Sequence, residues 1–590
     1  MNPELPSSRD DNTRTQTVTR RRVLQGGAAA TAVATASALS SKAAAQSSMG
    51  SLGPQPEVTE PPTGPHQVFQ HGVASGDPLP DSVLLWTRVS SHPGDLPGKN
   101  QGTATTVTWE VAKDENFTDI VTHGEVTATP DSDMTVKPEA SGLDALTSYF
   151  YRFRVLDGEF KDQVSPVGKT RTAPAAGASV DELRFALFSC ANWEAGYFHA
   201  YSDMARRGDI DYALCVGDYI YEYPRGEYGS KFGSIRSVNP PHEIISLEDY
   251  RERYGQYRSD QALQDAHAVC PWIVTWDDHE VANDSWADGA ENHSPEEGDY
   301  HARRDAAIQA YLEWLPIRAT AFSEGGHIYR NFGFGDLLEL NMLDLRTYRN
   351  QPVKFMDAKQ IDDPNRTMLG SEQFDWLTKK LSSSSTKWNL IGNSVMISPV
   401  LIPPLDPQTS SAVTQLLGIP EQGMPYNFDQ WDGFAAERRK VLRFLSDNDI
   451  KNTVWLTGDI HSAWACDVPE NPGAYDKEGA IATEFVCTSV TSSNIDDILK
   501  LPEDNGLSLT AENAFKGLNH HVKYLDYDGH GYSVVQVTPE FVHTDWIFIQ
   551  PDGKDHKQAA MFYGQSARAR VGQSVELNKS QLDPANHQVH

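Results

Sequence analysis

The segment WIVTWDDHEVAN, residues 272–283, runs from a short apolar stretch into a cluster of carboxylate, imidazole and amide side chains. Three other apolar stretches end in the same way: residues 183–189 before Cys190, 212–216 before GDYIY, and 453–456 before TGDIH. Each has the length and the β-branched and aromatic content of a buried strand. Side chains that follow the carboxyl ends of several buried strands meet in one crevice. The pattern predicts a polynuclear metal site.

The order of these patterns along the chain predicts two structural units. Residues 66–175 contain short strands and turns without helical periodicity, which is typical of an immunoglobulin- or fibronectin-like β-sandwich. From residue 180 to 565, strands alternate with amphipathic helices, so we expect an α+β catalytic domain there. The expected strands of the sandwich are residues 82–89, 105–112, 122–127 and 148–155. Residues 46–65 are predicted to be a linker and 566–590 a loosely held C-terminal tail.

Local signals place several helices and loops in the catalytic domain. Ser246 and Asp249 have the spacing of a helix capping box, and Ser371 is expected to cap a later helix. A further helix is expected at residues 435–445, with Arg438 and Arg439 on its outer side. A fourth is expected at residues 301–315. The long loops at about 222–245 and 399–427 are predicted to form the rim of a substrate pocket.

The first 45 residues have the features of a twin-arginine signal peptide. The sequence TRRRVL at residues 19–24 precedes an alanine-rich run at 28–39 and a small-residue cleavage site at 43–45. We therefore expect the Tat translocase to export the chain to an extracellular or periplasmic location. No segment is long and apolar enough to predict a transmembrane helix.

The charge of the chain excludes some classes of partner. Its 590 residues contain 50 basic and 81 acidic side chains, a net charge of -31. So acidic a surface disfavours stable binding to nucleic acid or to anionic membranes. We expect a monomer whose partners are small molecules.

The types of candidate ligand indicate which metals the site would hold. Cys190, Tyr221 and His461 offer a thiolate, a phenolate and an imidazole, which suit a transition metal better than Ca²⁺ or Mg²⁺. The phenolate favours Fe³⁺ over Zn²⁺. Asp218 could bridge to a second ion, and the amide oxygen of Asn283 suits a hard ion such as Ca²⁺.

Seven motifs in order resemble the PhoD-type alkaline phosphatases and phosphodiesterases. The resemblance covers nearly the whole chain after the signal peptide. The motifs are SC at 189–190, GDYIY at 217–221, WDDHEVAN at 276–283, LDLR at 343–346, NFDQWDG at 427–433, GDIH at 458–461 and EFVCTS at 484–489. Cys487 stands where the family pattern leads us to expect Gly.

The resemblance implies a calcineurin-like metallophosphoesterase fold, in which a β-sandwich is flanked by helices. It also implies one Fe³⁺ and two Ca²⁺ ions, and hydrolysis of phosphomonoesters and phosphodiesters at alkaline pH. The implied iron-side ligands are Cys190, Asp218, Tyr221 and His461. Asn283 and Asp459 are then the implied calcium-side ligands. The implied reaction is attack of a metal-activated hydroxide or oxo ligand on phosphorus.

His279 is the candidate catalytic acid for the leaving group, and an orienting role toward the Asp277–Asp278 loop is the alternative interpretation. Arg346 and Arg349 are interpreted either as a phosphate clamp or as partners of acidic residues. His520, His521 and His530 are further candidates to approach the pocket.

Other functions remain open at this stage. The same chemistry suits a phospholipase-D-like or teichoic-acid-cleaving phosphodiesterase, which would differ in access to the pocket. A non-catalytic binding protein would be expected to lose ligands, and none is missing here. An iron site used for redox chemistry is disfavoured, because phenolate ligation stabilises the ferric state.

Overall fold

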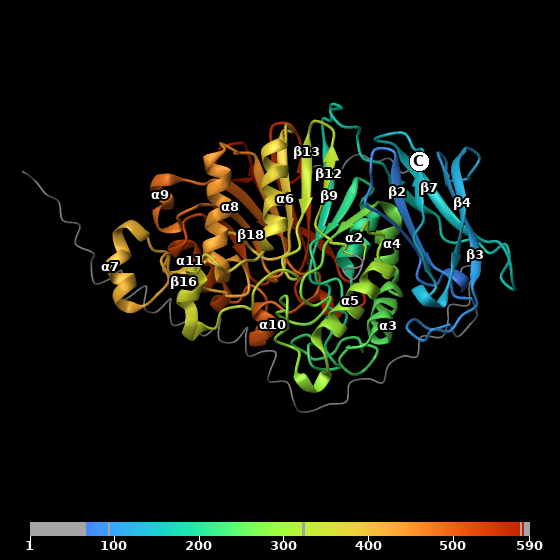
Figure 1. The fold of residues 1–590 in the computed structure, drawn as a ribbon, viewed down its shortest axis with the longest axis horizontal. Helices are drawn as coiled ribbons and strands as arrows, with labels where there is room; N and C mark the ends of the chain where they lie inside the picture. The colour runs from blue at the N-terminus through green and yellow to red at the C-terminus, as the bar shows by residue number, and fades with distance from the viewer. Residues whose placement is uncertain (1–66, 92–94, 321–324, 579–580, 583–590) are drawn as a thin grey trace, which may run out of the picture.

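The structure is a computed structural model that describes residues 67–582 except 92–94, 321–324, 579 and 580 (Figure 1). The predicted signal peptide and linker, residues 1–65, lie outside the described residues. Within the described part of the chain, no helix is long and apolar enough to cross a membrane.

Two large sheets form the centre of the molecule (Figure 1). Strands β9, β10 and β11, three of the four predicted from apolar stretches, run parallel side by side in the larger sheet. In order, the eleven-stranded sheet contains β24 (Glu576–Asn578), β23 (Met561–Ala569), β22 (Val542–Ile549), β21 (Gly531–Val537), β9 (Leu183–Phe188), β10 (Tyr212–Cys215), β11 (Trp272–Val274), β1 (Val73–Gly76), β2 (Ser82–Arg88) and β5 (Thr135–Val136), with β6 (Glu139–Ser141) also on β2.

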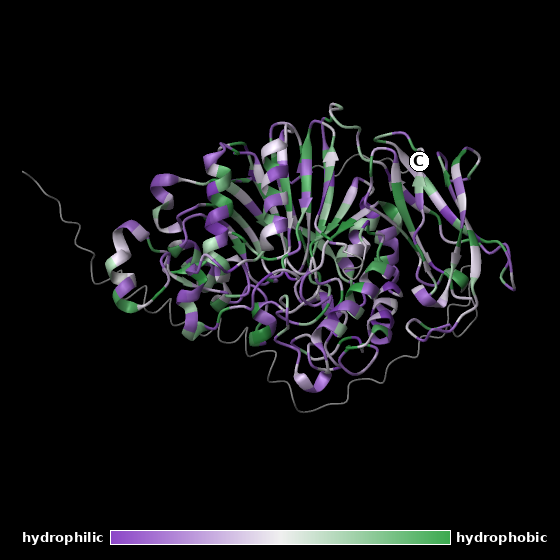
Figure 2. Ribbon diagram, in the orientation of Figure 1, coloured by the Kyte–Doolittle hydropathy of each residue, from purple (hydrophilic) through white to green (hydrophobic). Residues whose placement is uncertain are grey.

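The seven-stranded sheet carries the fourth predicted strand, β17. In order it contains β12 (Arg330–Phe334), β13 (Leu338–Met342), β14 (Trp388–Asn393), β17 (Thr453–Thr457), β19 (Ala482–Val486), β18 (Ala463–Val468) and β20 (Val522–Asp526). An apolar core that includes Phe185, Leu214 and Leu456 lies between the two sheets. Strands in the centre are largely hydrophobic, and the loops beneath them in the same view are largely hydrophilic (Figure 2).

Helices cover the outer faces, so the catalytic part has four layers. One aromatic-rich core joins the larger sheet to α2 (His199–Arg207), α3 (Leu247–Arg258), α4 (Gln261–Val269) and α5 (Tyr300–Trp314). Another core joins the smaller sheet to α6 (Gly370–Ser383) and α8 (Ala435–Asp447). The remaining helices are α7 (Pro407–Leu417), α9 (Tyr475–Glu478), α10 (Ile495–Leu499) and α11 (Gly506–Leu518). Short 3-10 turns are η2 (Gln67–Phe69), η3 (Pro130–Ser132), η4 (Pro295–Glu297), η6 (Phe355–Asp362), η7 (Trp431–Phe434), η8 (Pro472–Ala474) and η9 (Gly553–Asp555).

The N-terminal sandwich shares a sheet with the catalytic part. A four-stranded sheet contains β4 (Ile120–Ala128), β3 (Thr105–Ala112), β7 (Ser148–Val155) and β8 (Gly168–Arg171). Its apolar side chains pack on those of β1 and β2 in one core. Because β1 also pairs in parallel with β11 at Gly76 and Trp272, the second sheet of the sandwich continues into the catalytic sheet.

The predicted tail is wrong over much of its length. Strand β23 extends to Ala569, and β24 adds an edge strand to the large sheet. Beyond it, the backbone N–H of Leu582 donates to Asp545 at 2.8 Å. These contacts attach residues 566–578 and 582 to the sheet.

Two details of the predicted helices also differ. Helix α6 begins at Gly370 after Leu369, so Ser371 is inside the helix instead of capping it. Arg438 is buried, not outward-facing, because it pairs with Asp432 and donates to Gln422 at 2.9 Å. The capping box of Ser246 and Asp249 is confirmed. The expected 399–427 loop contains α7 and a small hairpin of β15 (Leu401–Ile402) and β16 (Met424–Pro425).

Candidate active site

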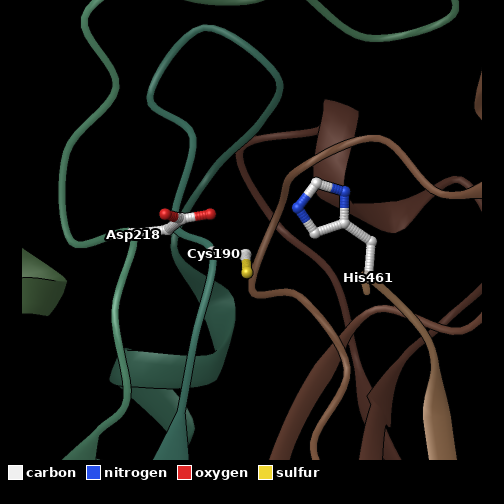
Figure 3. A group of neighbouring side chains, drawn as sticks. All are labelled: Cys190, Asp218 and His461. Carbon is white, nitrogen blue, oxygen red and sulfur yellow. The ribbon is translucent and has the colours of Figure 1, made fainter. Parts of the chain in front are cut away.

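Three neighbouring side chains, Cys190, Asp218 and His461, come from the ends of different strands (Figure 3). Cys190 follows β9, Asp218 follows β10 and His461 follows β17, and their ligand atoms lie within 4.8 Å of one another. The predicted convergence of these three residues is therefore present in the structure.

The backbone at these positions makes unusually sharp turns. Cys190, Asp218, Asp459 and His461 all have φ between 50° and 65°. This left-handed region is uncommon for residues other than Gly, and such strain concentrates at functional sites. Gly217 has φ 117°, and a Cβ there would lie 2.3 Å from the Cβ of Asp277. The strand ends are thus shaped to bring their side chains together.

Tyr221 completes this first group. Its hydroxyl donates to Asp218 at 2.8 Å and lies 3.3 Å from Nε2 of His461. Burial and then Asp218 raise the pKa values of both the Tyr221 phenol and the Cys190 thiol. Burial lowers the pKa of His461 to about 3, which leaves its imidazole neutral. A bound cation would supply the stabilisation that a thiolate and a phenolate need here.

A second group of carboxylates surrounds Asp278. Asp278 belongs to three sets whose ligand atoms lie within 4.8 Å: with Asp218 and His279, with Asp277 and Asp459, and with Asp284 and Asp429. One carboxylate oxygen of Asp218 is buried without a hydrogen-bond partner in the described structure, and Oδ1 of Asp278 has no hydrogen bond beyond its 3.3 Å ion pair with Arg346. Buried carboxylate oxygens require a partner, so the two groups fit adjacent metal ions.

Asn283 lines the same pocket as these carboxylates. Its backbone N–H donates to Glu222 at 2.8 Å, and its side-chain amide donates to Glu291 at 3.2 Å. The amide nitrogen therefore faces Glu291, and the amide oxygen is the atom suited to a hard cation.

Arg346 lies within the acidic group, which favours its predicted pairing with acids over a phosphate clamp. It pairs with Asp277 and lies 3.3 Å from Asp278, 2.6 Å from Asp429 and 3.5 Å from Asp459. Arg349 also contacts Asp429, at 2.5 Å. Although burial acts in the opposite direction, the two arginines hold the pKa of Asp429 below its usual range.

His279 lines the pocket and is held from behind by a buried carboxylate. Its Nδ1 lies 2.7 Å from Oε2 of Glu222, and its ring lies 4.2 Å from that of Tyr221. Burial lowers the pKa of His279, but Glu222, Asp278 and Asp218 outweigh it, and the net shift is upward. In this geometry Nδ1 is occupied by its hydrogen bond with Glu222.

The other histidine candidates lie away from the pocket lining. His520 is exposed and pairs with Asp476, whereas the buried His521 contacts the carbonyl of Pro399. His530 is buried between Asp497 and Ser489. Of these three, His530 is the one that acts electrostatically on His461, and none of them lines the pocket.

Sequence reasoning did not select Asp278, Asp284 or Asp429 as candidate ligands. The signal for Asp278 was its place in the WDDHEVAN motif, shortly after strand β11 ends at Val274 and beside His279. For Asp429 the signal was the NFDQWDG motif. Its role as a candidate ligand depends on its approach to Asp278, which is distant in sequence.

Comparison with known proteins agrees with this geometry. The profile of the PhoD-like phosphatases matches residues 185–546, and the profile of their N-terminal domain matches residues 56–174. The chain belongs to the PhoD-like phosphatase family. This PhoD-like phosphatase is therefore a phosphoric ester hydrolase, and the resemblance noted in its sequence is confirmed.

Two relatives cover most of this PhoD-like phosphatase. Alkaline phosphatase D of Bacillus subtilis (strain 168) is 39% identical over 506 residues, which are 83% of this chain and 79% of the relative. A solved structure of PhoD superposes with a TM-score of 0.76 and 36% identity, covering 88% of this chain and 94% of that one. A purple acid phosphatase from yellow lupin seeds gives a TM-score of 0.48 and 11% identity, a likeness too remote to bear on function.

Proposed function

We propose that this chain is an exported alkaline phosphatase that hydrolyses phosphomonoesters and phosphodiesters and thereby scavenges phosphate. The convergence of Cys190, Asp218, Tyr221 and His461 beside the acidic group around Asp278 carries this proposal. A thiolate, an imidazole and a phenolate suit Fe³⁺, and the neighbouring carboxylates suit Ca²⁺.

We assign the iron side to Cys190, Asp218, Tyr221 and His461, and the calcium side to Asn283 and Asp459. The position of Asp278 between the groups supports adding it to the calcium side. When bound, such ions supply positive charge against the phosphoryl oxygens and acidify the attacking water.

The side chains of the site position a carboxylate, hold the proton for the leaving group and exclude water. Arg346 and Arg349 keep Asp429 ionised and fix its position. Because Nδ1 of His279 is committed to Glu222, its Nε2 is the atom available to hold the proton for the leaving oxygen. Burial of Tyr221 and Cys190 excludes bulk water from this side of the phosphate site.

Metal analysis with a visible spectrum of the same sample tests the proposal. We expect about one iron and two calcium ions per chain and a purple phenolate-to-iron band, as the family resemblance implies. Tyr221→Phe should abolish the band, whereas Tyr228→Phe should keep it, because the Tyr228 hydroxyl is 3.5 Å from Nδ1 of His461 and contacts the opposite ring nitrogen. Zinc without colour would contradict the iron assignment. Failure to hydrolyse both p-nitrophenyl phosphate and a p-nitrophenyl phosphodiester would contradict the enzyme assignment.

Export is tested separately. Replacing Arg20 and Arg21 with Lys should leave the precursor inside the producing cell, whereas the unaltered chain should be found outside the cytoplasm. Export that is unaffected by the change would contradict the Tat assignment. Gel filtration of the exported chain should give the mass of a monomer.

A further inference from the structure

The lining of the catalytic pocket divides by chemistry into two parts. The pocket has a volume of about 340 Å³. One part contains the carboxylates and His279 described above. The other is an apolar wall that begins at Ile460, between Asp459 and His461. It consists of Ile460, Ile495, Ile498, Leu499, Tyr426 and Tyr527.

Helix α10 supplies three of the six side chains of this apolar wall. Ile495, Ile498 and Leu499 are half-buried and line the pocket. The two acidic residues of the helix, Asp496 and Asp497, are buried and absent from the pocket lining, which the described residues form. The helix therefore presents its apolar side chains to the pocket although two of its five residues are acidic.

Buried cations hold the acidic side of α10. Asp497 pairs with Lys554 and lies 3.1 Å from Nε2 of His530, and Asp496 lies 3.1 Å from Nζ of Lys231. A buried pair of this kind resists separation, because either charge alone would be costly to bury. These contacts fix the orientation of the helix, and they also neutralise Lys554 and Lys231.

The tyrosines of the wall pack on a rigid core. Tyr527 belongs to an apolar cluster with Phe515 and Trp464, and Tyr426 and Ile495 pack against it. The ring centroids of Tyr426 and Phe515 are 5.1 Å apart, and those of Phe515 and Tyr527 are 6.0 Å apart. The wall is thus formed before any substrate arrives, so binding to it requires little ordering of side chains.

The charge of the pocket restricts what the wall can bind. Seven carboxylates line the pocket, and among the described residues that line it none is Lys or Arg. Glu227 and Glu291 belong to none of the clustered ligand sets, so their charges remain when metals neutralise the inner carboxylates. A second anionic group beside the apolar wall would meet no lysine or arginine of the described lining and would be repelled by these carboxylates.

We propose that this apolar wall is a subsite for an uncharged alkyl or aryl ester group of the substrate. The proposal rests on the phosphoesterase function proposed above and names the substrate class that the site prefers: phosphodiesters with one apolar ester group. Ile498 and Leu499 are specificity-determining residues in this scheme, because they contact the ester group that is not cleaved.

A series of p-nitrophenyl alkyl phosphodiesters tests the subsite, because the leaving group stays constant while the alkyl group lengthens from methyl to butyl to hexyl. We expect kcat/KM to rise about twofold to fourfold per methylene until the wall is covered, mainly through KM. In Ile498→Ser and Leu499→Ser the hexyl-to-methyl ratio should fall at least tenfold. Ile498→Val should retain most of the hexyl-to-methyl ratio of the unaltered protein. Leu416→Ser on α7 is the matched control, since Leu416 is 85% exposed and outside the pocket lining.

A second comparison tests whether the pocket repels a second anionic group on the substrate. A p-nitrophenyl phosphodiester whose alkyl chain ends in a carboxylate should be cleaved at least tenfold less efficiently than the uncharged chain of equal length. Added salt should narrow this gap. Equal rates for the two esters, or no dependence on chain length in the unaltered protein, would overturn the subsite. These results need no variant to fold. If no member of the series and no p-nitrophenyl phosphate is cleaved, the proposed function itself fails.

Discussion

Nδ1 of His279 lies 2.7 Å from Oε2 of Glu222, and both side chains are buried. Glu222 also accepts hydrogen bonds from the backbone N–H of Asn283 and from the side chain of Asn292, both at 2.8 Å. Despite its burial, the pKa of Glu222 is lowered to about 2, chiefly by His279. An ionised Glu222 thus holds the imidazole in one orientation and favours its protonated form.

Replacing Glu222 with Gln should weaken catalysis and change its pH dependence. Without the carboxylate, the pKa of His279 falls, so less of the imidazole carries a proton at alkaline pH. We expect kcat to decrease about 10-fold to 100-fold and the alkaline limb of the kcat profile to move to lower pH. Glu227→Gln, which removes a carboxylate from the pocket lining, should move that limb much less. An unchanged profile in Glu222→Gln would show that His279 is not the group that titrates.

Arg346 contacts four carboxylates, so its loss would leave negatively charged groups facing one another. Arg346→Met removes the partner of Asp277 and the contacts with Asp278, Asp429 and Asp459. Loss of one member of a buried ionic group costs about 3–5 kcal/mol. We expect the metal-free protein to lose that much free energy of unfolding, measured by urea denaturation. Arg439→Met, which breaks a partly exposed pair with Asp362, should reduce the free energy of unfolding by about 1 kcal/mol. An equal loss in the two variants would show that Arg346 does not stabilise the acidic group as a buried counter-charge.

Much of the fold follows from the sequence because its strands have clear periodicity. The ranges 105–112 and 148–155 coincide with β3 and β7, since apolar and polar residues alternate along both. The buried strands before Cys190, Asp218 and His461 could also be predicted. Because β9 and β10 are parallel neighbours that end at one edge of their sheet, the meeting of Cys190 and Asp218 could be predicted as well. His461 follows β17 of the other sheet, so its approach to them depends on how the two sheets pack.

What could not be predicted depends on contacts distant in sequence. Arg438 would be expected on the surface from its charge, and only its pairing with Asp432 explains its burial. Strand β24 is a short edge strand with exposed Glu576 and Leu577, so it lacks an apolar pattern. Asp278 and Asp429 meet only because the loop after β11 and the turn before α8 lie together.

Stability should depend on pH through Glu503. Burial raises the pKa of Glu503 to about 8, so the folded chain holds this proton more tightly than the unfolded chain, where the pKa is about 4.3. The stabilisation is therefore present below about pH 4 and is lost as the pH rises toward 8. Glu503→Gln removes the ionisation and keeps an oxygen to accept the 2.9 Å bond from the Asp552 N–H.

Calorimetry at pH 5 and pH 9 measures this effect. Relative to the unaltered protein, Glu503→Gln should raise Tm at pH 9 by about 2–4 °C, allowing for partial exposure, and by less at pH 5. The exposed Glu478→Gln should show the same Tm difference at both pH values. A gain in Glu503→Gln that does not depend on pH would mean that the carboxyl ionises as easily in the folded chain as in the unfolded one.

The hydroxyl of Ser492 lies 2.6 Å from the Tyr221 oxygen and 2.9 Å from the carbonyl of Cys190. When Tyr221 is protonated, it donates to Asp218. If Tyr221 binds a ferric ion as phenolate, the oxygen becomes an acceptor, and Ser492 is placed to donate to it. A hydrogen bond to a phenolate stabilises its negative charge and so lowers the energy of the electrons that the charge-transfer band excites.

Ser492→Ala should therefore shift the phenolate-to-iron band to longer wavelength, because the phenolate loses a stabilising donor. The iron content should stay near that of the unaltered protein, since Ser492 offers no ligand in the assignment above. Ser493→Ala is the matched control: its hydroxyl donates to the carbonyl of Gly229 at 3.1 Å instead of to Tyr221, and its band should not move. A shift to shorter wavelength in Ser492→Ala, or equal shifts in both variants, would show that Ser492 does not donate to the phenolate. Because the readout is a wavelength, a general loss of activity or of metal in either variant would not be mistaken for the predicted effect.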